Sequence, residues 1–294
     1  MKNIRIRSLI FAMVLSVGFF AGCGNSTGDE AQTTQPAAQG ESAADEVAGD
    51  TAEPTAERTT LTVGFDASFP PYGYLDEESK EYIGFDLDLA AEVCKRQGWE
   101  LELRAIDWDS KDLELSSGAI DCIWNGFTIN GREDQYTWTV PYADNVQVIV
   151  VAADSGITSF ADLAGKTVAV QNDSSAYKAL TDAGDEDMAA LTASFGELLQ
   201  VPEYNTAFMN LEMGAADAVA MDVGVAEYQM ESRDGSYVIL EETLINEEYG
   251  VGFKLGNEEL RDTVQATMLE MAQDGTFARI AEEWGLTDSI VLGK

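Results

Sequence analysis

The stretch from Trp124 to Arg132, WNGFTINGR, carries side chains that could hold an anion. It begins like the end of a buried strand, breaks at Gly126, offers the Thr128 hydroxyl and ends on an arginine. A guanidinium binds a carboxylate through two parallel hydrogen bonds, which a lysine cannot reproduce. Because the chain has 53 Asp and Glu against 17 Lys and Arg, Arg132 is either a surface residue or a means of holding an anion.

Other polar or aromatic residues also follow apolar runs that we predict to be strands. The run LTVGF ends at Asp66, LELRAI is followed closely by Trp108, DCIW leads into Asn125, TVAV into Gln171 and DAVAM into Asp222. In open α/β sheets, ligands bind in the crevice beyond the carboxyl ends of the strands. The sequence therefore predicts that these residues line one shared cleft.

The segment QNDSSAYKAL reads as a strand end followed by a serine cap and a helix. Backbone N–H groups in the first turn of a helix have no partner within it. We therefore expect free N–H groups near Ser174 and Ser175 to face the cleft, where they can hold a carboxylate.

These residues are positioned by an alternation of short apolar runs and amphipathic stretches over residues 59–294, which indicates α/β layering with mostly parallel sheets. The segment FDLDLAAEVCKRQG predicts a helix that ends at Gly98 and places Cys94 on its apolar face. Cys94 and Cys122 either form one disulfide or remain as two buried thiols.

Six blocks in order give the chain a family resemblance: FDASFPPYGY, IGFDLDLAAEV, IDCIWNGFTINGRE, LAGKTVAVQNDSS, ADAVAMD and MAQDGTFARIAEEWG. Together they resemble the extracellular solute-binding proteins of the polar amino-acid ABC uptake family over nearly all of residues 59–294. The resemblance implies a periplasmic-binding-protein-like fold: two α/β lobes, joined by two crossing segments, that close on a free amino acid. Lobe 1 would take residues 59–145 and 250–294, and lobe 2 residues 146–249.

The resemblance gives Arg132 and Thr128 the ligand carboxylate and Asp222 the ligand ammonium. Backbone donors around Gly126 and Asn125 would add to the carboxylate site, because a closed cleft must satisfy both charges of an amino acid. Phe69 and Trp108 would form apolar walls, while Asp66 and Gln171 would face the ligand's side chain. Family members commonly have glycine near Ser174, so Asp173 departs from the pattern beside the carboxylate site.

Asp66 favours a ligand whose tip donates hydrogen bonds, since Asp222 is already assigned to the α-ammonium. Gln171 can accept or donate and so permits a cationic or an amide tip. We expect a basic amino acid, with glutamine or another polar neutral amino acid as the alternative, and rejection of glutamate and aspartate.

Residues 1–22 form a predicted signal peptide, with a basic start and an apolar run too short to span a bilayer. It ends in FAGC, which resembles a bacterial lipobox, although Phe20 stands where leucine is usual. Cys23 is therefore the expected lipidation site. Residues 23–58 are acidic and poor in large apolar residues, which predicts a disordered linker. We expect a protein tethered by lipid to the outer face of the cell membrane, extracellular or periplasmic.

Several chemistries are excluded by composition. The chain has no histidine, so Ser-His-Asp sites and histidine-bearing zinc sites are excluded. The acidic DAGDEDM lacks the ligand spacing of a calcium loop, and we expect no metal or cofactor. A net charge of −36 makes nucleic acid a poor partner. Since no Walker A motif is present, the ATPase of a transporter would be a separate chain.

Three functions remain open at this point. We favour a monomeric, non-enzymatic binding protein that hands its amino acid to an ABC permease. The alternatives are a two-lobed dehydratase acting on a cyclic amino-acid precursor and a ligand sensor for a receptor. Fold alone does not separate these, but the residues identified all have binding roles, and none resembles a general acid.

Overall fold

The computed structural model describes residues 58–231, 233 and 235–294. The predicted signal peptide, Cys23 and nearly all of the predicted linker therefore lie outside the described residues. Within the described part, none of the helices is both long and apolar enough to cross a bilayer.

Lobe 1 is built on a five-stranded sheet in the order β5-β1-β6-β13-β7. Its strands are β1 Thr60–Phe65, β5 Glu100–Ala105, β6 Cys122–Ile123, β7 Tyr136–Trp138 and β13 Gly252–Lys254. The short strands β2 Ser68–Phe69, β3 Gly73–Leu75 and β4 Tyr82–Ile83 form a small second sheet. Its helices are α1 Phe85–Gln97, η1 Trp108–Ser110, α2 Lys111–Ser117, α7 Glu258–Gln273 and α8 Thr276–Glu283.

Lobe 2 has a second five-stranded sheet in the order β10-β9-β11-β8-β12. Its strands are β8 Ala143–Ala152, β9 Thr167–Gln171, β10 Glu197–Val201, β11 Ala218–Asp222 and β12 Tyr237–Tyr249. Its helices are η2 Phe160–Leu163, α3 Ser175–Thr181, α4 Glu186–Ser194, α5 Tyr204–Glu212 and α6 Val223–Glu231.

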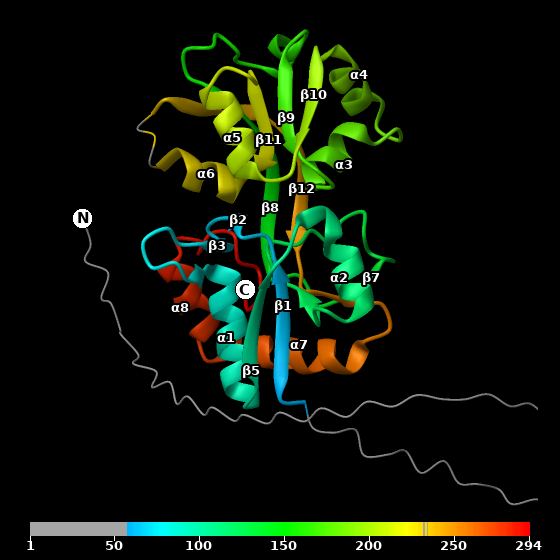
Figure 1. Cartoon of the computed structure of the whole chain (residues 1–294), viewed down its shortest axis with the longest axis vertical. Coiled ribbons are helices and arrows are strands. Elements are labelled where there is room, and N and C mark those ends of the chain that lie inside the picture. Colours follow the sequence, from blue (N-terminus) through cyan, green and yellow to red (C-terminus); the bar gives the residue numbers. More distant parts are fainter. Residues whose placement is uncertain (1–57, 232, 234) are drawn as a thin grey trace, which may run out of the picture. The chain divides into compact units, whose positions relative to one another are not determined.

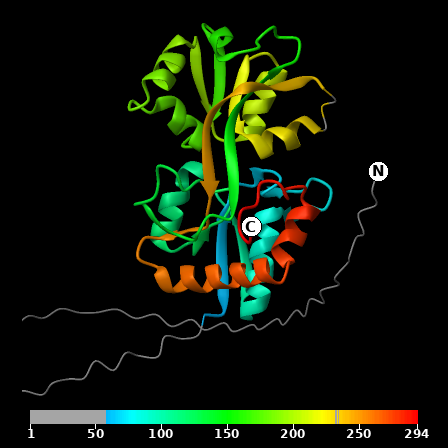
Figure 2. The ribbon, with the colours of Figure 1, turned by 180° about the vertical axis from the view of Figure 1, so that it is seen from behind.

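The long strands β8 and β12 run side by side from one lobe to the other (Figure 1), and the same pairing is visible from behind (Figure 2). They are antiparallel, with Ala143 opposite Tyr249 and Asn145 opposite Glu247. The sequence boundaries expected near residues 145 and 250 fall inside β8 and just after β12, and the division of the chain at those residues stays a prediction.

The two-lobed α/β class predicted from the sequence is confirmed. In detail the sheets are mixed, because only two of the four neighbouring strand pairs in each sheet are parallel. The antiparallel pairs involve β8 and β12, which run between the lobes (Figure 1), and β13 in lobe 1. The predicted strand-end residues follow β1, β5, β6, β9 and β11, each of which has at least one parallel neighbour.

Local signals explain several elements. Helix α1 ends where Gly98 adopts a left-handed conformation with φ 72°, as the glycine predicts. Cys94 and Cys122 are both buried and free, which decides the open alternative in favour of two thiols. Burial raises the pKa of both thiols.

Candidate functional site

A small cavity lies between the lobes, where strands of both sheets end. Every residue predicted to bind the ligand lines it except Asp66, and one residue was not predicted, Tyr204. The lining residues are Phe69, Trp108, Asn125, Gly126, Thr128, Arg132, Gln171, Ser174, Ser175, Tyr204 and Asp222.

Arg132 is buried, with 2% of its surface exposed. Its Nη1 donates to the Thr128 carbonyl and its Nη2 to the Asp173 carbonyl, each at 3.2 Å. Its Nε has no hydrogen-bond partner among the described residues, and in the same part of the chain no carboxylate lies within 4.0 Å of the guanidinium. A buried guanidinium bonded only to carbonyls retains N–H groups and a full charge for an anionic ligand.

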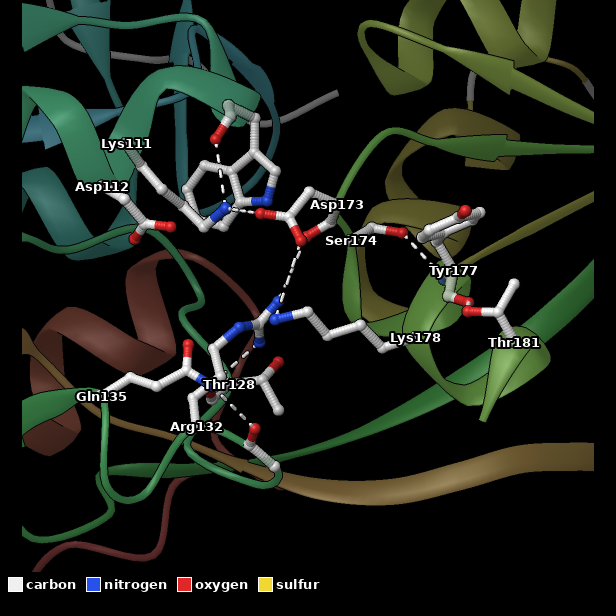
Figure 3. Close-up of polar contacts among 12 residues, drawn as sticks. Lys111, Asp112, Thr128, Arg132, Gln135, Asp173, Ser174, Tyr177, Lys178 and Thr181 are labelled. Atoms are coloured by element: carbon white, nitrogen blue, oxygen red, sulfur yellow. Dashed lines mark hydrogen bonds and ion pairs between the residues drawn. The ribbon is translucent and has the colours of Figure 1, made fainter. Parts of the chain in front are cut away.

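Asp173 lies beside Arg132, but its carboxylate is held elsewhere. It forms ion pairs with Lys111 of lobe 1 and Lys178 of α3. Figure 3 shows Lys111, Arg132 and Lys178 converging on this residue. Burial raises the pKa of the Asp173 carboxyl, but Lys111 and the other two cations outweigh burial and hold the pKa below its usual value. The negative charge that Asp173 brings beside Arg132 is therefore neutralised by two lysines.

The serine segment forms the predicted cap. Ser174 precedes α3, and its hydroxyl accepts a hydrogen bond from the Tyr177 backbone N–H at 3.0 Å. The Ser175 hydroxyl donates to the Glu247 carboxylate. The Ser174 hydroxyl thus accepts within the cap and the Ser175 hydroxyl donates to Glu247, while the first backbone N–H groups of the helix remain as donors towards the cavity.

The Gly126 backbone N–H was expected to add to the carboxylate site, and the structure shows a different partner for it. Its N–H donates to the buried Asp86 carboxylate at 2.6 Å, so this donor is not available to a ligand carboxylate. The residue has φ 56°, and a Cβ there would lie 2.7 Å from the Phe69 ring. Glycine is required here because neighbouring aromatic rings approach the backbone closely, Tyr249 among them.

Two buried carboxylates, Asp222 and Glu247, lie close together at the Asp222 side of the cavity. The Asn145 and Gln147 side-chain amides each donate to both of them, at 2.6–2.8 Å. Tyr249 also donates to Asp222, at 2.5 Å. Burial, and then the charge of Glu247, raises the pKa of Asp222 to about 7.

Asp66 lies just outside the cavity. Its carboxylate accepts from Gln171 Nε2 at 2.6 Å and from the Ser68 N–H at 2.8 Å, and burial raises its pKa to about 6. It lines a wider groove that adjoins the cavity at Trp108 and is also lined by Arg104, Asp107, Asp109, Glu114 and Glu203. The prediction that Asp66 lines the cavity is therefore corrected. Asp66 lies in the adjoining groove, and its hydrogen bond with Gln171 connects it to lobe 2.

Aromatic rings form the walls. The Phe69 ring lies 5.8 Å from Tyr204, and the Trp108 ring packs edge-on against Phe127 at 5.4 Å. Arg132 stacks over Phe127 at 5.2 Å. Flat apolar faces of this kind can enclose an aliphatic chain and attract a cation at its tip.

The comparison with known proteins places this geometry in a family. The family of bacterial extracellular solute-binding proteins, family 3, matches residues 61–287. The chain belongs to this family.

Relatives within and around the family share its two lobes. The chain is 28% identical to the L-cystine-binding protein TcyA of Bacillus subtilis, over 94% of this chain and 96% of that one. An ABC uptake transporter substrate-binding protein from Streptococcus pneumoniae, solved with bound histidine, is 30% identical with a TM-score of 0.72, covering 79% and 94% of the two chains. An ancestral arginine-binding protein, solved with arginine and with glutamine, is 34% identical with a TM-score of 0.70, covering 78% and 99%.

Sequence reasoning missed Tyr204, Glu247, Asn145 and Gln147. Tyr204 begins α5, three residues after β10 ends at Val201, and the strand-end rule could have found it. The other three lie within the long strands β8 and β12, where no strand end marks them. No group of three acidic or cysteine side chains suited to a metal occurs in the described part of the chain.

Proposed function

We propose that the protein binds a free amino acid in the cavity between its lobes and delivers it to an ABC permease. The observation that carries this proposal is the pairing of opposite charges at two ends of one small cavity. Arg132 supplies unpaired N–H groups for a carboxylate, and Asp222 supplies an acceptor for an ammonium. A free amino acid carries both groups on one carbon, so a single ligand satisfies both residues.

The side chain of the ligand would point past Trp108 into the adjoining groove. Five carboxylates and one arginine line that groove, and the arginine is already paired with Glu114 at 3.1 Å. The negative field of these carboxylates attracts a ligand side chain with a cationic tip and repels one with an acidic tip. We therefore favour a basic amino acid such as arginine or lysine, with glutamine or another polar neutral amino acid as the runner-up.

L-Cystine is a second candidate, which the likeness to TcyA supports over most of both chains. Cystine has an amino-acid group at each end, so its second end would lie in the groove. Its second ammonium would meet Asp107 and Glu203 there, and its second carboxylate would meet Arg104.

A thermal-shift panel tests the proposal and separates these ligands. Protein freed of bound ligand by unfolding and refolding is mixed with each common amino acid and with cystine, as wild type and as Asp66→Asn. We expect arginine or lysine to raise the Tm most, and Asp66→Asn to reduce that shift more than the shift with glutamine. Stabilisation by glutamate, or by none of the compounds, would contradict the proposal.

The remaining parts of the proposal concern partners and place. Cys23 would carry lipid and hold the protein at the outer face of the cell membrane, while a permease with a separate ATPase chain receives the ligand from a monomer. We infer binding without chemical change, because the cavity residues are all accounted for by contacts to an amino acid. The dehydratase and sensor alternatives are not favoured.

A further inference from the structure

Strand register brings Asp222 and Glu247 together from opposite sides of β8. Asp222 on β11 stands opposite Gln147, and Glu247 on β12 stands opposite Asn145. Residues 145 and 147 share one face of β8 because side chains alternate along a strand. The two carboxylates therefore meet over that face, although they lie 25 residues apart in sequence.

One oxygen of each carboxylate accepts hydrogen bonds from the same two amide nitrogens, so these oxygens lie within two hydrogen-bond lengths of each other. Asn145 Nδ2 lies 2.8 Å from Asp222 Oδ1 and 2.6 Å from Glu247 Oε1, and Gln147 Nε2 lies 2.6 and 2.7 Å from the same two oxygens. Each amide thus divides its two N–H bonds between the carboxylates. The Tyr249 bond also ends on Asp222 Oδ1, so three side-chain donors meet at this one oxygen.

The side chains around Asp222 and Glu247 do not balance the negative charge of the two carboxylates. Tyr249 of β12, Tyr204 of α5 and Tyr72 after β2 face Asp222, and Ser175 of α3 faces Glu247. Among the described residues, no lysine or arginine nitrogen lies within 4.0 Å of either carboxylate. Two adjacent buried carboxylates without a cation ionise in two separate steps, and the second step is shifted towards neutral pH.

We propose that Asp222 and Glu247 hold one proton between them in the ligand-free protein, and that the ligand's ammonium expels it on binding. This rests on the proposed function, in which the ammonium binds Asp222. The step conserves charge: the neutral Asp222 carboxyl becomes a carboxylate paired with the incoming ammonium, and the proton goes to solvent. Glu247 does not line the cavity, so it acts as a positioning residue through its charge.

The direction of the pH effect follows from the raised pKa of Asp222, about 7. Above that pH the carboxylate is already ionised, and affinity is insensitive to pH. Below it the ligand must displace a proton, so affinity falls, by about 25-fold between pH 7.5 and pH 5.5 for one group of this pKa. The protein would therefore capture ligand less well in an acidified medium.

The first test needs no ligand. The side-chain carboxyl carbons of ligand-free protein are titrated by ¹³C NMR in wild type, Asp222→Asn, Glu247→Gln and Glu248→Gln, the last being an exposed neighbour on the same strand. We expect a carboxyl that titrates near pH 7, is missing in Asp222→Asn and moves down by at least about one pH unit in Glu247→Gln only. An Asp222 carboxyl that ionises below pH 5, or that is unmoved in Glu247→Gln, would overturn the proposal.

The second test measures proton release during binding. L-Arginine is titrated calorimetrically into wild type, Glu247→Gln and Glu248→Gln at pH 6.0, in two buffers with different ionisation enthalpies. Asp66 can add protons for a cationic ligand, so the quantity to compare is the difference between variants. Release should fall by at least about 0.4 proton in Glu247→Gln and not in Glu248→Gln. Equal proton release by wild type and Glu247→Gln, with normal binding by both, would overturn the shared proton. Absence of binding by all amino acids would instead overturn the proposed function.

Discussion

The Lys111 ammonium in lobe 1 forms an ion pair with the Asp173 carboxylate in lobe 2. The lysine side chain is 1% exposed and also donates to the Trp108 carbonyl at 3.3 Å, with its Nζ 5.1 Å from the centroid of the Trp108 ring. Asp173 has φ 50°, in the left-handed region, and its carbonyl accepts from Arg132. One residue of lobe 2 therefore meets two cations of lobe 1, and both contacts exist only when the lobes are together.

Lys111→Met should weaken ligand binding without touching the ligand, because it removes a contact that stabilises the closed lobes. Since Asp173 is 38% exposed, we expect a loss of about 1–2 kcal/mol, or roughly 5- to 30-fold in Kd. Calorimetry with arginine checks this against Lys95→Met, which removes an exposed pair with Glu92 within α1. Equal affinities of the two variants would show that the pair does not support closure.

The ligand-free protein should be more stable at pH 5.5 than at pH 8. Burial raises the pKa of Asp66 to about 6 and those of Asp86 and Asp222 to about 7, all above the value of an unfolded chain. The folded state therefore binds more protons than the unfolded state, and stability is lost as the pH rises through 6–7. We expect the free energy of unfolding to fall by about 2–4 kcal/mol over this interval, measured by urea denaturation.

The variant Asp86→Asn tests whether Asp86 is one source of the dependence of stability on pH. The asparagine oxygen can still accept from the Gly126 N–H and the Tyr142 hydroxyl, which are the partners of Asp86, but it cannot titrate. The change in stability between pH 5.5 and pH 8 should shrink by about a third to a half, and Asp134→Asn at an exposed position should leave it unchanged. A wild-type protein that gains stability towards pH 8 would refute the assignment.

Gln171→Lys should shift selectivity away from cations. Gln171 donates to Asp66 at 2.6 Å, so a lysine there would neutralise the carboxylate that we propose faces the ligand's tip. We expect arginine to lose at least about tenfold in affinity while glutamine loses less. Competition measurements with both ligands decide the matter: parallel losses would mean that Asp66 plays no part in selectivity.

Cys23→Ala should release the protein from membranes while leaving ligand affinity unchanged, because the predicted lipid is the only anchor that the sequence suggests. Fractionation of cells that express each form, followed by calorimetry on the soluble variant, measures both properties. Two lipid chains give stable attachment where one is marginal. Equal membrane association of the two forms would remove the lipoprotein proposal.

Strand-end residues were predictable because parallel strands bring their carboxyl ends to one edge of a sheet. That rule placed Asn125, Gln171 and Asp222 around one cavity. The serine cap of α3 was likewise readable, since it depends on neighbours within the same turn.

Contacts that depend on tertiary register could not be read in this way. Glu247 reaches Asp222 only because β8 stands between β11 and β12 with a particular alignment. Lys111 meets Asp173 only because the lobes approach each other, and the Gly126 N–H faces Asp86 because α1 packs beside the strand end. Nothing local to Glu247, Lys111 or Asp86 distinguishes them from the other charged residues of an acidic chain.

The most direct test of amino-acid binding is calorimetry of Arg132→Ala beside wild type, with the amino acid that stabilises wild type most. Arg132 is the buried cation whose guanidinium is bonded only to carbonyls, and its loss would leave the ligand carboxylate unpaired in a closed cavity. We predict that Arg132→Ala, correctly folded by circular dichroism, loses about 2–5 kcal/mol of binding free energy, or roughly 30- to several-thousand-fold in Kd. A variant that binds the amino acid as tightly as wild type would contradict the account.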